Sequence, residues 1–551
     1  MHFLTSAAAI PLAVTIVQLS SQVAADQSTY QPCPLLRAYY PAPSINKTSD
    51  VIQAASQQFA ALFDGLIQTG GSDDFGSITP NTTSFSVVLF SGAVDAVDDP
   101  IFFEYHHTAP VSEDSNGNVT LDTVFPLGTL TQLFTVYSWL IEMGDTEWES
   151  PITKFLPELT AANASVDTLA VNWDEVTVGA LAGQMSGIAR DSNVCHLGEP
   201  CDYQSFVNAF AGVAPVFLPD TTPAISNAAF QLLTFALERK SPRCKVRDSA
   251  NIFSTAMLEP LNMTRSGFLS SENEANIFGQ GMNSSAIGEP AALSLLSTTR
   301  DLARAGHAML SSRLVPAAVT RRWLQPVADT SNLRNGVGRP WEIYHAGQYA
   351  NSSVLDVYTK SGAVSAYSSY FGLAPDFGAG FAILAHDASG AAPDLNVYAD
   401  VVSLAVVELE ELAAEQAAAR YAGEFSSSGS DDVAVFNVSS DGPGFIVPVL
   451  AVGGVDLRKQ VADVAGIELE DLDFRVYPTN VIKGTMHQFV AVFQDKSAPV
   501  DMDTPTCITW QNVDSLGPDV ADRFIFEINE SSGSAKSVII PAKDVTLTSA
   551  E

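Results

Sequence analysis

The sequence is poor in basic residues. Its 551 residues contain 27 Lys and Arg against 62 Asp and Glu, so the formal net charge at pH 7 is −35. An acidic surface repels the phosphates of nucleic acids and the headgroups of anionic lipids. We therefore expect neither nucleic acid nor a membrane among the partners, and we expect a monomer. The apolar content of 46% excludes a disordered chain, and the length indicates two or three domains.

Long apolar stretches are missing after the N-terminus. The first 25 residues contain no Asp, Glu, Lys or Arg, and Phe3–Leu19 is largely apolar. The small residues at 23–25 suit a signal peptidase. No later stretch is long enough to span a membrane. We predict a signal peptide over residues 1–25 that is removed, and a secreted, extracellular protein.

Cysteine is scarce, with five residues in all. Cys195 and Cys201 are six positions apart across a turn-forming segment, so we predict a disulfide between them. Cys33 and Cys507 lie near opposite ends, where a second disulfide would join the termini, and Cys244 is left over. Since no Cys/His cluster has metal-ligand spacing, we expect no metal and no other cofactor.

Sequons for N-glycosylation are frequent, and none has proline at its central position. This abundance agrees with a secreted glycoprotein. The nine predicted sites are Asn46, Asn81, Asn118, Asn163, Asn262, Asn283, Asn351, Asn437 and Asn529.

Apolar periodicity divides the chain into an α/β part and a β-rich part. The first helix and two strands, and then three strands and a long helix near residue 420, enclose a helical middle region. The economical arrangement is one sheet assembled from both ends of this part, with a helical lobe inserted. Beyond the serine-rich stretch at 426–430, short strands indicate a small β domain. The predicted helices are 51–66, 130–143 and 393–420, and the predicted strands are 85–90, 101–105, 354–359, 367–373, 378–386, 433–438, 445–452, 486–493 and 523–528.

Several catalytic signatures are absent. No Gly-x-Ser-x-Gly occurs, so an α/β-hydrolase nucleophile elbow is excluded, and no glycine-rich phosphate loop is present. His106-His107 and His386-Asp387 could carry acid–base chemistry. His106 and His107 fall in the stretch of a strand, where adjacent residues point to opposite faces. His386-Asp387 ends a predicted strand, where an ordinary turn is expected. We interpret them as structural residues.

Nine short motifs occur in an order that resembles the serine β-lactamase and penicillin-binding-protein superfamily, in particular the secreted fungal β-lactamase-like proteins. The resemblance implies a β-lactamase-type sandwich over residues 30–420, with an antiparallel sheet flanked by helices, and a barrel-like all-β domain over 421–551. It also implies hydrolysis or transfer through a serine acyl-enzyme. The motifs are Phe103–Thr108, Leu127–Thr135, Gly144-Asp145, Pro157–Leu159, Gln184–Gly187, Ser226-Asn227, Ser297–Asp301, Pro340–Ile343 and Tyr358–Gly362.

The catalytic positions implied by this resemblance are degenerate. The family uses Ser-x-x-Lys at a helix start, where the amine takes the proton of the serine; here these positions hold Thr129 and Gln132. An amide has no basic nitrogen. The Tyr of a Tyr-x-Asn element is replaced by Ile225, while Asn227 remains.

A third element of the family, Lys-Thr/Ser-Gly, is intact. It corresponds to Lys360, Ser361 and Gly362, and Ala363 is placed to offer an oxyanion-hole amide. By resemblance this element orients a substrate carboxylate. Asn227, Ser361, Gly362 and Ala363 are therefore the expected substrate-binding residues, with Thr129, Gln132 and Lys360 at the catalytic positions.

Two functions remain open from the sequence. Loss of a general base costs about 10²–10⁴-fold in rate, and loss of the nucleophile of a serine hydrolase costs about 10⁶-fold. These losses favour a pseudoenzyme that keeps a cleft for a small-molecule ester, amide or peptide-like ligand. The alternative is a repurposed esterase, amidase or acyltransferase that acts on a small-molecule ester or amide in specialised metabolism.

Overall fold

The computed structural model describes residues 30, 32–33, 35, 39–93, 99–112, 117–162, 170–241, 248–346, 355–439, 442–498, 509–511, 513 and 520–549. The predicted signal peptide lies outside these residues. The chain divides into two compact units, one of residues 1–42, 347–355 and 411–551 and the other of residues 43–346 and 356–410. Among the described helices, none combines the length and the apolar character that a membrane crossing requires.

The larger unit is built on a sheet of eight strands in the order β4-β3-β13-β12-β11-β10-β9-β8. Strands from both ends of this part of the sequence meet where β3 pairs antiparallel with β13, as predicted. The strand expected at 354–359 continues to residue 364, and β8 to β10 were not predicted. The strands are β3 (Thr83–Ser91), β4 (Ile101–His107), β8 (Ala328–Asp329), β9 (Asn335–Val337), β10 (Glu342–Ala346), β11 (Leu355–Val364), β12 (Tyr367–Ala374) and β13 (Ala379–Asp387).

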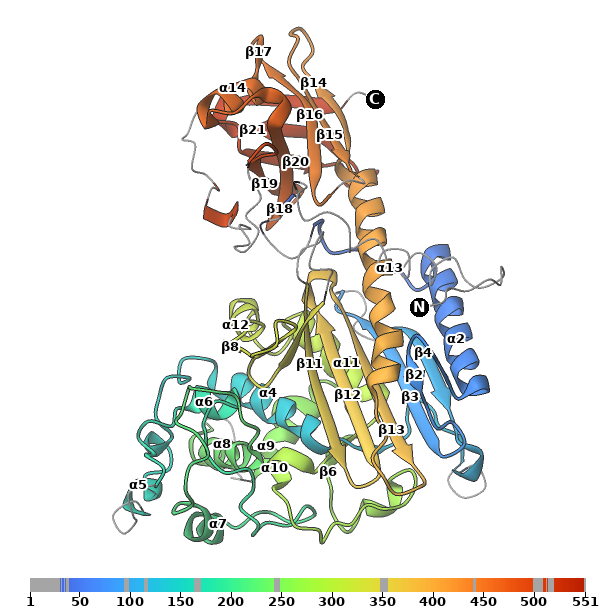
Figure 1. Cartoon of the computed structure of the whole chain (residues 1–551), viewed down its shortest axis with the longest axis vertical. Helices are drawn as coiled ribbons and strands as arrows, with labels where there is room; N and C mark the ends of the chain where they lie inside the picture. The colour runs from blue at the N-terminus through green and yellow to red at the C-terminus, as the bar shows by residue number, and fades with distance from the viewer. Residues whose placement is uncertain are drawn as a thin grey trace. The chain divides into compact units, whose positions relative to one another are not determined.

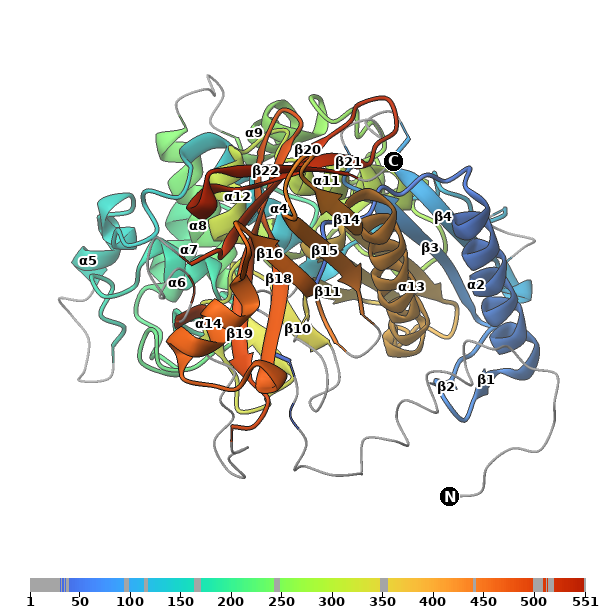
Figure 2. The same cartoon turned by 90° about the horizontal axis from the view of Figure 1, so that it is seen from above.

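The helices lie on both faces of this sheet (Figures 1 and 2). The first predicted helix, α2, begins after the Ser49 cap and ends at Gly70, whose φ of 76° suits glycine. The other helices of this unit are α4 (Thr131–Met143), α5 (Glu158–Ala162), α6 (Val178–Ala182), α7 (Tyr203–Phe210), α8 (Asn227–Lys240), α9 (Ser249–Phe253), α10 (Pro290–Leu293), α11 (Thr299–Leu310) and α12 (Ala317–Trp323); α2 is Asp50–Thr69, and α13 (Asn396–Tyr421) begins here.

Strand β3 is buried along its whole length because both of its faces are covered. Phe85 and Val87 pack in a cluster with α2 and α13, whereas Val88 and Phe90 belong to the core shared with the helical lobe. Alternate residues of a strand point to opposite faces, so one continuous apolar run serves two cores. This antiparallel sheet between two layers of helices is the sandwich that the sequence analysis predicted.

The smaller unit contains a closed barrel of eight strands. Its order is β15-β14-β22-β21-β20-β19-β18-β16, and an additional pairing between β15 and β16 closes the ring. The stretch at 426–430 leads from β14 into the turn before β15. The elements are β14 (Gly423–Ser426), β15 (Val433–Val438), β16 (Phe445–Val452), β17 (Val455–Asp456), α14 (Leu457–Ala465), β18 (Leu472–Lys483), β19 (Met486–Asp495), β20 (Arg523–Ile528), β21 (Ala535–Ile540) and β22 (Val545–Ser549).

Aromatic side chains fill the barrel. Phe526 contacts Phe436 and Phe489 at centroid distances of 5.0 and 5.2 Å in edge-on arrangements. Tyr421, at the end of α13, joins this cluster at 4.9 Å from Phe489. Such pairs add about 0.5–1.5 kcal/mol each beyond their buried area, so the barrel has a core of its own.

Candidate functional site

Thr129 lies in a tight turn, Gly128–Leu130, directly before α4. Gly128 has a φ of +55°, and a Cβ there would come within 2.6 Å of the carbonyl of Ala363. Because Gly128 has no side chain, the backbone of the turn can lie directly against β11. Thr129 is half-buried, and its hydroxyl donates to the carbonyl oxygen of Ser361 at 3.2 Å. The single hydroxyl proton is thus directed at a carbonyl, which is not a base.

Gln132, in the first turn of α4, is fully buried. Its Nε2 donates to Oδ1 of Asn227 at 3.0 Å, and its Oε1 accepts from Nε2 of Gln184 at 2.8 Å. Both polar ends of the side chain are therefore hydrogen-bonded to other side chains. Among the described residues, no hydrogen bond joins Gln132 to Thr129.

The hydrogen bonds of Gln132 continue into a wider network. Asn227 donates from Nδ2 to Oδ1 of Asp191 at 2.7 Å. Gln184 accepts at Oε1 from the backbone amide of Ser226 at 3.2 Å. Each amide oxygen and each amide nitrogen of the three side chains thus has a partner, which is what buried polar groups require. We call Gln132, Gln184, Asn227 and Asp191 the amide network.

Lys360 and Ser361 on β11 are both engaged by Glu342 of the neighbouring strand β10. Lys360 is 1% exposed, and its Nζ lies 2.5 Å from Oε1 of Glu342. Ser361 donates to Oε2 of Glu342 twice, from its backbone amide at 2.9 Å and from its hydroxyl at 2.7 Å. The cation of this element is thus neutralised by the chain itself.

Gly362 allows β11 to approach the start of α4. A Cβ at Gly362 would lie 2.1 Å from the carbonyl oxygen of Leu127 and 2.5 Å from the amide nitrogen of Leu130. Ser369 of β12 fixes the same turn by donating to the oxygen of Leu127 at 2.7 Å. The predicted residues of β11 and the turn that carries Thr129 are therefore brought together.

Ile225 and Ala363 complete the accessible part of the site. Ile225 is 38% exposed and directly precedes Ser226, which caps α8 by accepting from the backbone amide of Ala229. Its hydrocarbon side chain can neither donate nor accept a proton. Ala363 is exposed and lies against Gly128.

His106 belongs to a separate network on the sheet. Its Nδ1 lies 2.9 Å from Oγ of Ser86, which also contacts Thr299 at 2.8 Å. Burial, and secondly the charge of Arg300, lower the pKa of His106. Although a serine beside a histidine resembles a nucleophile and its base, Ser86 is completely buried and no substrate can reach it.

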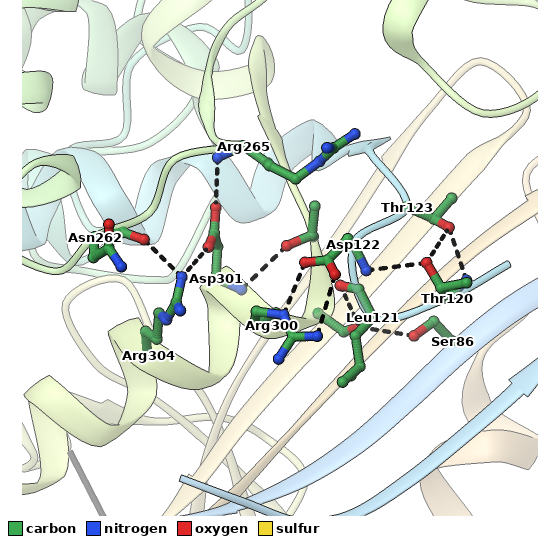
Figure 3. A network of polar contacts seen from close by, with 12 residues as sticks. Ser86, Thr120, Leu121, Asp122, Thr123, Asn262, Arg265, Arg300, Asp301 and Arg304 are labelled. Carbon is green, nitrogen blue, oxygen red and sulfur yellow. Dashed lines mark hydrogen bonds and ion pairs between the residues drawn. The ribbon is translucent and has the colours of Figure 1, made fainter. Parts of the chain in front are cut away.

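Figure 3 shows the polar contacts between α11 and the neighbouring loops, next to Ser86. Arg300 forms a bidentate ion pair with Asp122 at 2.8 and 3.1 Å, and Asp301 accepts from the backbone amide of Arg265 at 3.0 Å. Arg304 donates to the carbonyl oxygen of Asn262 at 2.7 Å. These contacts tie surface loops to α11, which is a structural role.

The two residues of the second candidate pair, His386 and Asp387, belong to different hydrogen-bond networks. His386 Nε2 pairs with the carbonyl oxygen of Gln280 at 2.9 Å. Asp387 instead accepts from three threonine hydroxyls and from the backbone amide of Ser389. Burial raises the pKa of its carboxyl, but the hydrogen bonds from Thr83, Ser389 and Thr79 outweigh burial and lower this pKa. The pair therefore does not act as one acid–base unit. The threonines are Thr79, Thr82 and Thr83.

The predicted disulfide between Cys195 and Cys201 is present, with Cα atoms 5.0 Å apart. Cys33 is also disulfide-bonded. Its expected partner Cys507, like Cys244, lies outside the described residues, so that pairing stays a prediction. Within the described residues, no group of three or more His, Cys, Asp and Glu side chains could hold a metal ion.

Sequence reasoning missed Gln184, Asp191 and Glu342 as site residues. Gln184 and Glu342 stand in motifs that carry the family resemblance, but neither type of residue has an assigned role there. Gln184 also has a φ of 61°, which is rare for a residue other than glycine, but only the structure reveals this. Asp191 gave no signal, since its role depends on a contact with α8.

Comparison with known proteins identifies two matched families. Residues 92–405 match the family "Beta-lactamase", and residues 413–551 match "Beta-lactamase-like-like, C-terminal domain". A "Beta-lactamase-like protein" of Arthroderma benhamiae is 24% identical over 571 residues, which cover 92% of this chain and 93% of the relative.

Solved structures also align with the chain. A class C β-lactamase has a TM-score of 0.48 and 14% identity, with 66% of this chain and 98% of that chain covered. SurE has a TM-score of 0.47 and 16% identity, with 91% of this chain and 100% of that chain covered.

Proposed function

The chain belongs to the β-lactamase family, and from this premise we propose that it is a secreted family member that binds a small-molecule ester, amide or peptide-like ligand without forming an acyl-enzyme. The observation that carries the proposal is the state of Gln132. Its oxygen accepts from Gln184 and its nitrogen donates to Asn227, so it has no role as a base for Thr129.

Proton balance supports this proposal. Acylation requires the hydroxyl proton to leave the nucleophile for a base as the new bond to the carbonyl carbon forms. The hydroxyl of Thr129 donates to the Ser361 carbonyl, and Gln132 has no basic nitrogen. Loss of a general base alone reduces rates by about 10²–10⁴-fold.

A binding role remains because the surface elements of the site persist. Thr129, Ile225, Ser361 and Ala363 are all at least partly exposed, and they lie on elements held by close backbone contacts. Each side-chain amide of the amide network has a hydrogen-bond partner at its oxygen and at its nitrogen. A site that had simply decayed would be expected to contain unpaired polar groups, each costing about 1–3 kcal/mol.

Secretion is part of the proposal. All seven predicted glycosylation sites within the described residues have exposed asparagines, as an attached glycan would require. The Cys195–Cys201 disulfide agrees with an oxidising compartment. The seven are Asn46, Asn81, Asn118, Asn262, Asn283, Asn437 and Asn529; Asn163 and Asn351 lie outside the described residues.

The test is intact-mass analysis after incubation with a fluorophosphonate or a β-lactam. We expect no adduct on the wild-type protein, and hydrolysis of activated esters no faster than that of Thr129→Ala. Thr129→Ser alone should gain little. The double variant Thr129→Ser, Gln132→Lys should regain some acylation, because hydroxyl and amine then share one helix face.

The Gln132→Lys change in this double variant also affects Gln184. A lysine at 132 can donate to Asn227, but the donor end of Gln184 would then face an ammonium group. Turning the Gln184 amide presents its oxygen to the ammonium group but breaks the hydrogen bond that this oxygen accepts from the Ser226 amide. Adding Ile225→Tyr should raise acylation further.

The repurposed esterase or acyltransferase is the competing function. Thr129 keeps a half-exposed hydroxyl, and a threonine nucleophile would appear as an adduct on that residue. Wild-type turnover that disappears in Thr129→Ala would establish this function and overturn the proposal.

A further inference from the structure

Three donors from two consecutive residues of β11 converge on one carboxylate. Lys360 Nζ contacts Oε1 of Glu342, while the amide and the hydroxyl of Ser361 both donate to Oε2. A cation and two further donors aimed at both oxygens form the kind of charge-assisted set by which proteins bind carboxylates. Here the bound carboxylate is supplied by the chain itself.

The converging donors lie at the candidate site. The carbonyl oxygen of Ser361, whose amide and hydroxyl bind Glu342, also accepts from the hydroxyl of Thr129. Lys360 is buried, whereas the Glu342 side chain is 43% exposed and Ser361 is exposed. The Glu342 carboxylate therefore lies between a buried cation and solvent, where the carboxylate of a ligand would have to bind.

We propose that Glu342 determines the ligand class of this site: it occupies the carboxylate position, so that the site selects neutral esters or amides over ligands that carry a carboxylate. This inference rests on the proposed ligand-binding function and specifies its chemistry. An incoming carboxylate would have to displace Glu342 from Lys360 and Ser361, or bind beside a like charge. A neutral ligand has neither cost.

A purely structural role for Glu342 gives a different expectation. The carboxylate would then only neutralise the buried Lys360, and its loss would lower stability without creating a binding site. The two roles are separated by carboxylate binding in the variant Glu342→Gln, which keeps the shape of the side chain and removes its charge.

The experiment measures equilibrium dissociation constants for benzylpenicillin, which carries a carboxylate, and for its neutral methyl ester. Calorimetric titration is performed on the wild type, Glu342→Gln and Glu342→Ala. We expect the wild type to bind the ester at least ten-fold more tightly than the acid. Both variants should bind the acid at least ten-fold more tightly than the wild type does, with the ester affinity changed less than three-fold.

Two further proteins serve as controls. Glu158→Gln removes the same charge from a carboxylate of nearly equal exposure, 45%, that pairs with Arg239 on α8; its affinities should equal those of the wild type. The double variant Glu342→Gln, Lys360→Met removes the cation as well, and the gain in acid binding should disappear. Melting temperatures and circular dichroism establish that each variant is folded.

Equal affinity of the wild type and both Glu342 variants for the acid overturns the inference, and so does a lack of detectable acid binding in all of them. Intact mass is recorded on the same samples. A covalent adduct on the wild type overturns the proposed function and leaves the comparison of acid with ester to decide the role of Glu342.

Discussion

Gln132 carries a side-chain amide, which forms hydrogen bonds but has no basic nitrogen. Its oxygen is paired by Gln184, 52 positions further along the chain, whose amide supplies the donor that this oxygen needs. An unpaired amide at this buried position would cost about 1–3 kcal/mol. The two glutamines therefore act as a unit, and a change at either one affects the other.

Glu238 on α8 gives a prediction of pH-dependent stability. Burial, opposed by a hydrogen bond from the amide of Ser249 and reinforced by the charge of Asp248, raises the pKa of Glu238 from 4.5 to about 7. Between these values the folded chain binds a proton that the unfolded chain has released. The contribution of Glu238 to stability is therefore full below pH 4.5 and is lost as the pH rises through about 7.

Glu238→Gln should remove this dependence, because the amide stays neutral and its oxygen can still accept from Ser249. We expect the variant to be more stable than the wild type at pH 8 by up to about 3 kcal/mol, and nearly equal to it at pH 4.5. Urea denaturation at both pH values measures the difference. Glu272→Gln, a change at an exposed residue, is the charge-matched control; a wild-type pH slope retained in Glu238→Gln would contradict the prediction.

Among the elements, the contact between the Gly128–Leu130 turn and β11 positions the site. It depends on two glycines that face backbone atoms, Gly128 and Gly362. Both glycines stand in motifs that the sequence analysis quoted, but only Gly362 was assigned a role there. The importance of Gly128 comes from a strand more than 230 positions away.

A matched pair of glycines tests this contact. Gly128 (φ +55°) and Gly378 (φ +59°) have nearly the same left-handed backbone, but a Cβ at Gly378 meets nothing within 4 Å. Gly378→Ala should cost only the conformational penalty of about 1–2 kcal/mol. Gly128→Ala carries the same penalty and also forces β11 away, so we expect a loss of at least about 2 kcal/mol more.

Denaturant unfolding of the two alanine variants measures the difference. Equal losses would mean that the turn and β11 are not tightly joined. A larger loss in Gly128→Ala would show that the position of Thr129 relative to Ser361 depends on this close approach.

The elements that the sequence predicted correctly are those with strong periodicity. The runs that became β3, β12 and β13, and the helices α2, α4 and α13, were placed within a few residues. Strand β10 is short, begins with the charged Glu342 and shows no regular alternation of buried residues. Because β10 was missed, the contact of Glu342 with β11 could not be foreseen.

In the barrel, β18 was missed for a different reason. Its twelve residues include Pro478, and the pairing with β19 shifts register between Pro478 and Ile482, next to Asn480 with a φ of 57°. This irregularity interrupts the alternation that marks a strand. Partners across strands and helices are likewise invisible in a single sequence, which is why the lysine motif was found and the carboxylate that binds it was not.

At the scale of the whole molecule, the exposed sequons predict a glycoprotein. Protein from a eukaryotic secretory host should begin near Ala25 or Asp26, and its mass should fall on enzymatic removal of N-glycans. The same chain made in the bacterial cytosol is the control and should not shift. A secreted protein that retains residues 1–25 and shows no shift would contradict the prediction.

The barrel begins and ends at neighbouring strands. Its first strand, β14, pairs antiparallel with its last, β22, with Phe425 opposite Ser549, and the ring closes elsewhere, between β15 and β16. The beginning of β14 and the end of β22 therefore lie next to each other in the barrel. A short linker could join them, new termini could be cut into any surface turn, and the strand order would be unchanged. The barrel therefore has the strand order that circular permutation requires, provided that the end of α13 with Tyr421, which packs in the barrel core, is kept.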